Sequence, residues 1–176
     1  MRKFQPRRGF TLVEILCVVV ILGIASAVII PQIGSRDDLN AAAAARVMMS
    51  DLMYAQNRSI AMQKKHFLQF NGQSYNVMTR DADTLPLYTI TQPVTKNAYT
   101  TTFGDKNTAL GNASIGTTSF NGATTIAFDE MGSPYSYVAA TNVLTSLTSA
   151  GTIKVTNGKV TLTISIEPYT GEATVQ

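Results

Sequence analysis

The sequence predicts an α+β protein in which a long N-terminal helix packs on an antiparallel β-sheet domain. Residues 10–30 are apolar over about the 20 residues that a membrane-spanning helix needs. Residues 40–64 place apolar side chains at helical spacing, and alternating runs separated by Asn-Gly pairs follow residue 66. We therefore expect four segments: a basic leader at 1–9, a transmembrane helix at 10–30, its amphipathic continuation at 31–65, and an antiparallel β domain at 66–176.

The N-terminal apolar segment is interpreted as a retained membrane helix, because it exceeds the roughly 7–15 apolar residues of a secretory signal. Pro31 closes the segment and, lacking an amide hydrogen, predicts a bend or break. Four basic residues in the leader predict a cytoplasmic N-terminus, with the β domain on the other side of the membrane. Glu14 lies inside the apolar run, where an ionised group needs a partner. Cleavage between Gly9 and Phe10 would create an α-amine that neutralises Glu14.

The second helical segment is amphipathic. Its apolar face carries Met48, Leu52, Ala55 and Met62, whereas polar residues such as Asp51 fall mostly elsewhere. A methionine-rich face can indicate a cofactor site or an adaptable binding groove, but packing against a sheet is the stronger interpretation. We predict that this face packs against the sheet.

Three Asn-Gly pairs mark turns in the β domain: Asn71-Gly72, Asn121-Gly122 and Asn157-Gly158. The first pair predicts a two-residue type I′ turn between strands at 66–70 and 73–78. Near the end of the chain, Pro168-Tyr169-Thr170-Gly171 predicts another turn. The other expected elements are strands at 85–94, 99–103, 124–128, 152–156, 159–166 and 172–176, and a mobile loop in the Ser- and Thr-rich segment 139–150.

The charge of the chain argues against a nucleic-acid partner. The formal net charge is +3, but four of the fourteen basic residues lie in the leader, which leaves ten basic against eleven acidic residues after residue 9. A nucleic-acid-binding domain keeps a basic surface in its folded part. Cys17 is the only cysteine, so an intrachain disulfide is excluded, and we interpret it as a small apolar residue of the helix.

Residues for catalysis or for a metal site are sparse. His66 is the only histidine, so a zinc or iron site lacks ligands, and we expect a surface or half-buried strand residue at this position. No phosphate-binding loop, nucleophile elbow or dinucleotide-binding fingerprint occurs. The sequence therefore predicts a protein that is not an enzyme and needs no cofactor or metal. An enzyme or sensor domain that uses His66 or Asp129 is the rival interpretation.

Two groups of charged residues have alternative interpretations. Asp81-x-Asp83 and Asp129-Glu130 supply the carboxylate oxygens that calcium prefers, but their spacing matches no defined calcium loop, and we expect solvated turn acids. Lys64-Lys65 is expected at a helix end, where cations suit the helix dipole, with phosphate contact as the alternative.

The segment from Gly9 to Glu14, Gly-Phe-Thr-Leu-Val-Glu, resembles the processing site of type IV prepilins and type II secretion pseudopilins. The resemblance implies that a membrane-embedded prepilin peptidase removes residues 1–9 by cutting after Gly9 and then N-methylates Phe10. It also implies that Glu14 pairs with a terminal amine during filament assembly. Pro31 falls where many members of the family kink this helix.

The later segments are similar to those of the H-type minor pseudopilin of type II secretion and of FimT-like minor pilins. These proteins place a Phe-Asp-x-x-Gly segment mid-domain, as at Phe128–Gly132, and a Thr-Gly segment near the end, as at Thr170-Gly171. The resemblance implies an inner-membrane subunit with a periplasmic domain that joins other pilins or pseudopilins in a filament. DNA-binding FimT-like pilins carry arginines after the terminal glycine, whereas Glu172 follows here. A secretion pseudopilus and a type IV pilus both remain open.

Overall fold

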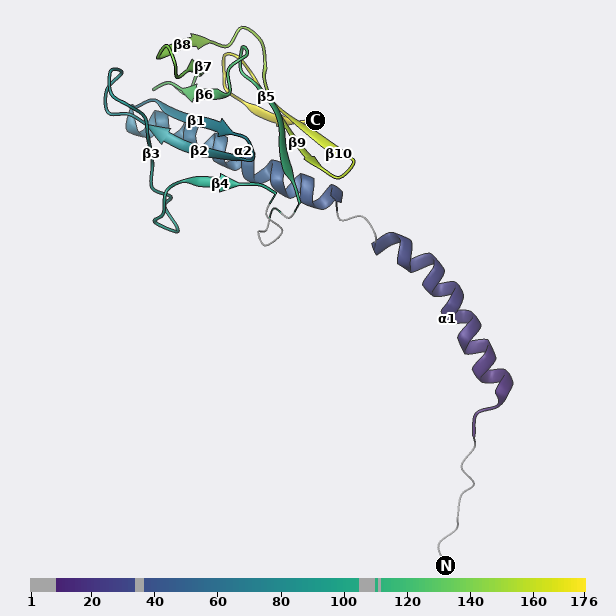
Figure 1. Cartoon of the computed structure of the whole chain (residues 1–176). Helices are drawn as coiled ribbons and strands as arrows, with labels where there is room; N and C mark the ends of the chain where they lie inside the picture. The colour runs from purple at the N-terminus through teal and green to yellow at the C-terminus, as the bar shows by residue number, and fades with distance from the viewer. Residues whose placement is uncertain (1–8, 34–36, 105–109, 111) are drawn as a thin grey trace, which may run out of the picture. The chain divides into compact units, whose positions relative to one another are not determined.

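A computed structural model describes residues 9–33, 37–104, 110 and 112–176 of the chain. The chain divides into two compact units, Met1–Arg36 and Asp37–Gln176. The first unit contains the helix α1, and the second contains the helix α2 and the β-strands (Figure 1). The predicted α+β class, with a helix on antiparallel sheets in a pilin-like arrangement, is confirmed.

Helix α1 spans Leu12–Ile33 and begins directly after Thr11. The helix continues past Pro31, so it ends three residues later than the expected boundary at residue 30. The apolar side chains from Leu12 to Ile24 lie exposed along it, with exposed fractions from 48% at Val18 to 82% at Leu12. Among the described residues of this unit, therefore, the apolar side chains from Leu12 to Ile24 have no covering layer.

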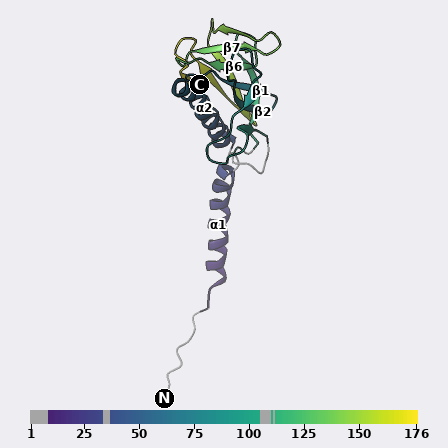
Figure 2. The ribbon, with the colours of Figure 1, turned by 90° about the vertical axis from the view of Figure 1, so that its left-hand side faces the viewer.

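Helix α2 spans Asp37–Met62 and packs on strands of both sheets (Figures 1 and 2). The predicted packing of the Met48, Leu52 and Ala55 face is confirmed, because all three side chains are buried. Met62 departs from the prediction and is 49% exposed, because the helix ends there. An alanine-rich stripe extends the buried face toward the start of α2: Ala41, Ala44 and Ala45.

Gln63 terminates α2 with a left-handed backbone, at φ 50°. The amide of Lys64 then donates to the carbonyl of Ser59 at 3.2 Å, which is the long-range bond of a Schellman motif. Lys64 and Lys65 consequently lie beyond the helix, and the last turn contains no basic residue. The prediction that Lys64-Lys65 marks the helix end is confirmed to within two residues, because α2 ends at Met62.

The β domain contains two antiparallel sheets in the described residues. The larger has the order β3-β2-β1-β6-β7-β8, with β4 also paired to β2, and the smaller has the order β11-β10-β9-β5. The strands are β1 His66–Asn71, β2 Ser74–Thr79, β3 Tyr88–Thr89, β4 Thr100–Thr102, β5 Ser114–Ser119, β6 Thr125–Phe128, β7 Pro134–Val138, β8 Val143–Ser146, β9 Gly151–Asn157, β10 Val160–Ile166 and β11 Ala173–Val175.

The first hairpin turns one residue later than predicted. Asn71 pairs with Ser74, so the two turn residues are Gly72 and Gln73, not Asn71 and Gly72. Only Gly72 has a positive φ, 60°, which is the pattern of a type II′ turn. This register sets Phe70 opposite Tyr75, two buried aromatic rings, whereas the predicted turn would have set Phe70 opposite Gln73.

The other two Asn-Gly pairs behave differently from each other. Asn121 and Gly122 both have positive φ, 50° and 85°, as a type I′ turn requires. Asn157 instead pairs with Val160, which moves the turn to Gly158 and Lys159, as in the first hairpin. Asn-Gly therefore located all three turns, but the cross-strand pairs decided which residues occupy them.

The Ser- and Thr-rich segment 139–150 is not simply a mobile loop, because β8 lies within it and pairs with β7 along four residues. Threonine and valine favour strands, and the pair of Tyr137 with Leu144 anchors the register. Strands β5 and β7 were also not predicted. Glycine and threonine in β5, and the proline that begins β7, concealed the alternation of these strands.

The main core lies between α2 and the sheets. Leu68, Val77, Ile126, Ile153 and Ile164 are fully buried there against the α2 face. A smaller apolar cluster is separate from it and is made of side chains that alternate with those of the main core: Phe67, Ala127 and Tyr137.

Candidate functional site

The N-terminal motif forms the first turn of α1. The hydroxyl of Thr11 accepts a hydrogen bond from the amide of Glu14 at 3.3 Å, and the carbonyl of Thr11 accepts from the amides of Glu14 and Ile15. Thr11 is therefore the N-cap of the helix, and Glu14 occupies the third helical position, the sequence arrangement of a capping box. A carboxylate in the first turn is also stabilised by the helix dipole.

The residues around the expected cleavage point are accessible. Gly9 is exposed and Phe10 is 78% exposed, and both precede the first helical residue. Cys17 is an exposed free cysteine on α1. Within the described ranges, none of the helices is both long enough and apolar enough to cross a membrane.

Residues 5–30 match the prokaryotic N-terminal methylation motif. The matched residues include Gly9, Phe10, Glu14 and the part of α1 up to residue 30, so the match covers the N-terminal part of the chain only. This prepilin-like motif supports a type IV pilin or pseudopilin family, with processing by prepilin peptidase and assembly into pilin-like filaments. It also suggests an N-terminus anchored in the inner membrane. No curated protein and no solved structure matches the chain.

Two segments singled out in the sequence meet at one side chain of α2. The amide nitrogen Nε2 of Gln56 donates to the carbonyl of Gly132 at 2.9 Å and to the carbonyl of Thr170 at 2.8 Å. Gly132 ends the Phe-Asp-x-x-Gly segment, and Thr170 begins the Thr-Gly segment. Gln56 therefore joins α2 to both segments, which lie 38 residues apart in the chain.

The shape of the Phe-Asp-x-x-Gly segment depends on Asp129. Its Oδ1 accepts hydrogen bonds from the amides of Met131 at 3.0 Å and Ser133 at 2.7 Å, which closes the turn between β6 and β7. Gly132 has a φ of 86°, and a Cβ there would lie 2.9 Å from Ile60 Cδ1. The side chain of Asp129 therefore stabilises the turn in which it lies.

The Thr-Gly segment is crowded at its glycine. Gly171 has a φ of 69°, and a Cβ there would lie 2.7 Å from Gln56 Nε2 and 3.0 Å from the Gly132 carbonyl oxygen. Only glycine allows the chain to pass this close to α2 without displacing Gln56. The two segments thus have a shared structural role, which is docking onto one turn of α2.

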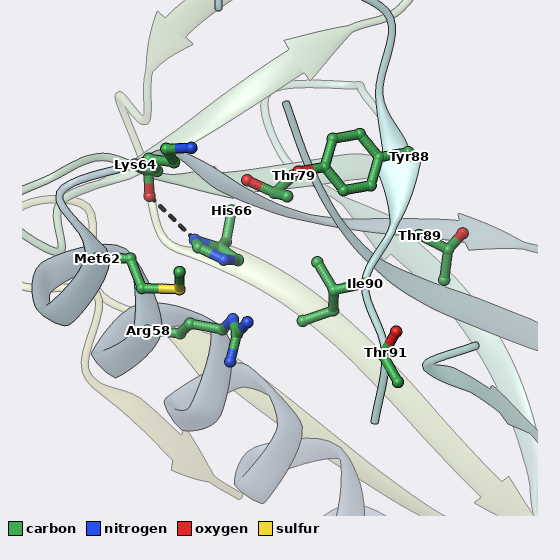
Figure 3. A pocket seen from close by; sticks show the side chains of 9 residues that line it. All are labelled: Arg58, Met62, Lys64, His66, Thr79, Tyr88, Thr89, Ile90 and Thr91. Carbon is green, nitrogen blue, oxygen red and sulfur yellow. Dashed lines mark hydrogen bonds between the residues drawn. The ribbon is translucent and has the colours of Figure 1, made fainter. Parts of the chain in front are cut away.

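His66 is buried, at 1% exposure, which corrects the expectation of a surface or half-buried residue. The ring nitrogen Nδ1 lies 2.9 Å from the Lys64 carbonyl and 3.3 Å from Ser59 Oγ, and Figure 3 shows the first of these contacts. A carbonyl only accepts, so Nδ1 carries the hydrogen and donates to it. Burial is the main reason that the pKa of His66 is lowered from its ordinary value of 6.5. The hydrogen bond to the Lys64 carbonyl raises this pKa, whereas the positive charges of Arg58 and Lys64 lower it.

The paired acids lie in ion pairs with the two lysines. Asp81 is 3.0 Å from Lys64 Nζ, and Asp83 is 2.9 Å from both Lys65 Nζ and an Arg80 guanidinium nitrogen. These contacts also give Lys64 and Lys65 carboxylate partners. In the part of the chain that the structure describes, no group of three His, Cys, Asp or Glu residues is arranged to hold a metal ion.

Sequence reasoning did not single out three side chains that the structure makes prominent. Asp51 was placed off the packed face but is buried, at 8% exposure. Gln56 and Arg58 also fall mostly off the apolar face in the sequence pattern, yet Gln56 joins two distant segments and Arg58 lines a pocket. No local pattern distinguishes these residues from solvated ones, because their partners lie far away in the chain.

Proposed function

We propose that the protein is a minor pseudopilin, a structural subunit of the periplasmic pseudopilus of a type II protein secretion system. The match of residues 5–30 to the methylation motif carries the proposal. Prepilin peptidase cuts after Gly9, Phe10 becomes the methylated N-terminus, and Glu14 pairs with such an amine in the assembling filament. The precursor is a single-pass protein of the inner membrane, with its N-terminus in the cytoplasm and its β domain in the periplasm.

The exposed apolar surface of α1 supports this role. A helix with side chains such as Leu16 and Ile21 about 60% exposed needs an apolar environment. In the proposal, lipid supplies this environment before processing, and neighbouring subunits supply it in the filament. The protein is then a structural subunit and not an enzyme.

The assignment to the H-type group draws on the Phe-Asp-x-x-Gly and Thr-Gly segments. Both segments accept a hydrogen bond from Gln56, so both have the same structural role in the domain. This shared role supports using the two segments together for the assignment. FimT-like minor pilins of type IV pili share these segments and are the alternative. Glu172-Ala173-Thr174 follows Gly171, a sequence without the arginines of DNA-binding members.

Deletion of the gene and complementation separate the two machines. For a pseudopilin, deletion abolishes export of type II secretion substrates and leaves twitching motility and DNA uptake unchanged, and the wild-type gene restores export. A Gly9→Val precursor, in which the cleavage site is blocked, fails to restore export at equal abundance. Loss of twitching or DNA uptake with normal export would instead favour the FimT-like alternative.

A further inference from the structure

A pocket of about 310 Å³ opens between the last turns of α2 and the edge strand β3. Arg58 and Met62 contribute to it from α2, and Ile90 contributes from the segment after β3. Figure 3 shows the side chains of Arg58, His66 and Ile90 pointing toward one another. The pocket therefore combines a cation, a buried imidazole and apolar surface.

Arg58 has no acidic partner in this pocket among the residues that the structure describes. Among the described residues, the ion pairs use Lys64, Lys65 and Arg80, and none includes Arg58. One guanidinium nitrogen, Nη1, donates to the Tyr54 hydroxyl at 2.9 Å, while Nε is buried without a hydrogen-bond partner in the same part of the chain. A guanidinium stays protonated at every physiological pH, so a partly buried one favours an anion beside it.

The other polar groups of the pocket define the charge of a suitable ligand. Lys64 is compensated by Asp81 at 3.0 Å, so Arg58 is the one charged lining residue that has no ion-pair partner among the described residues. His66 donates from Nδ1 to the backbone, and its neutral ring adds no charge to the pocket. A singly charged anion matches this arrangement better than a doubly charged phosphate.

The apolar residues of the pocket indicate what the anion is attached to. Met62 and Ile90 place aliphatic groups beside the guanidinium. Of the threonines in the lining, Thr79 donates its hydroxyl to the Lys65 carbonyl at 2.9 Å. We propose that this pocket binds a carboxylate carried on a short apolar group, with Arg58 as the partner of the carboxylate. The planar guanidinium fork matches carboxylate geometry. A free small acid and the C-terminal carboxylate of a polypeptide share this chemistry.

Methionine methyl groups report binding directly. The full chain is labelled with ¹³C at its methionine methyls, placed in detergent micelles and titrated with sodium butyrate. We expect a saturable shift of the Met62 methyl signal and none at Met131, which is 81% exposed and does not line the pocket. Sodium chloride at equal ionic strength produces no saturable shift. A titration without saturation at Met62 would overturn the proposal.

Substitutions on α2 identify the partner of the carboxylate. Arg58→Gln should weaken butyrate binding about tenfold or more, because it removes the charge from the contact. Arg58→Lys keeps the charge and loses less, whereas Arg46→Gln, at an exposed position on the same helix, changes nothing. Unchanged signals from the other methionines establish that each variant is folded. Equal affinity in the wild type and in the Arg58→Gln variant would contradict the assignment.

Two further ligands distinguish the sources of the carboxylate. Acetyl-alanyl-leucine presents a chain end, and its C-terminal amide is the matched control. Tighter binding of the peptide acid than of butyrate, with no binding of the amide, identifies a polypeptide end, whereas binding of butyrate alone identifies a small free acid. Equal saturation by the amide, or by inorganic phosphate, would refute carboxylate recognition.

Discussion

The Asp51 carboxylate accepts a 2.7 Å hydrogen bond from the hydroxyl of Tyr75 in the interior of the β domain. The hydroxyls of Tyr99 and Thr101 donate to the same carboxylate at 2.9 and 3.0 Å. Burial, together with the negative charge of Asp51, raises the pKa of Tyr75 and Tyr99, so both hydroxyls remain protonated donors. Asp51 thereby ties α2 to β2 and to the segment that ends in β4.

Replacing Asp51 by asparagine should destabilise the domain. The amide group keeps one acceptor but turns a donor toward the hydroxyls, so at least one hydrogen bond is lost, at a cost of about 1–3 kcal/mol. Urea unfolding of the full chain in detergent, followed by the near-ultraviolet circular dichroism of its tyrosines, measures the change. Glu172→Gln, at an exposed position outside the helices, removes a carboxylate away from these hydrogen bonds and is the control. Equal urea midpoints for the two variants would show that the hydrogen bonds of Asp51 do not stabilise the domain.

Gly171→Ala should destabilise the protein more than Gly122→Ala. Both glycines have positive φ, 69° and 85°, so alanine costs about 1–2 kcal/mol at either position. A Cβ at Gly122 meets nothing within 4 Å, whereas one at Gly171 lies 2.7 Å from Gln56 Nε2. The crowding should add about 1 kcal/mol or more. Thermal unfolding of both variants measures the difference, and equal losses would rule out the crowding at Gln56.

The stability of the domain should fall as the pH falls from 7 to 5. The pKa of His66 is lowered on folding, so the unfolded chain takes up a proton near pH 6.5 while the folded chain still resists it. The free energy of unfolding therefore decreases with pH through this range. His66 is the only histidine, and the lowered pKa values of Asp81 and Asp83 lie outside the window. Urea titrations at several pH values should give a free energy of unfolding that rises with pH, and His66→Gln should remove this dependence. A dependence that persists in the variant would show that another titrating group causes it.

Glu14→Gln should separate processing from assembly. Thr11 continues to cap α1, because its hydroxyl bonds the backbone amide of residue 14 and not its side chain. We expect normal cleavage after Gly9 but incorporation into filaments reduced about tenfold or more, because the carboxylate can no longer pair with a terminal amine in an apolar environment. Quantitative immunoblots of sheared filaments against whole cells measure incorporation. Wild-type incorporation of the variant would show that Glu14 has no role in assembly.

Sequence patterns predicted the elements that are determined by residues close together in the chain. Helical spacing of Met48, Leu52 and Ala55 predicted the buried face of α2, and the alternation from Val160 to Ile166 predicted β10. Asn71-Gly72 located a turn, but the pairing of Phe70 with Tyr75 moved it by one residue. The register of a hairpin depends on both strands at once, so the turn residues alone do not determine it.

The contacts that were not predicted join residues far apart in the chain. Asp51 and Tyr99 are separated by 48 residues, and Gln56 and Thr170 by 114. A polar residue on an amphipathic helix has the same sequence pattern whether it faces solvent or a distant hydroxyl. Asp51 and His66 are buried because the β domain packs around α2. The spacing of residues along one segment carries no information about this packing.

The proposed function requires that a prepilin-like precursor is matured between Gly9 and Phe10. Mass spectrometry of the protein purified from its host, with and without an intact prepilin peptidase gene, tests it most directly. With the peptidase present, we predict a mature chain that begins at Phe10 and carries one methyl group on its α-amine. Without the peptidase, the chain should keep residues 1–9. A chain that still begins at Met1 in the presence of the peptidase would rule out this maturation.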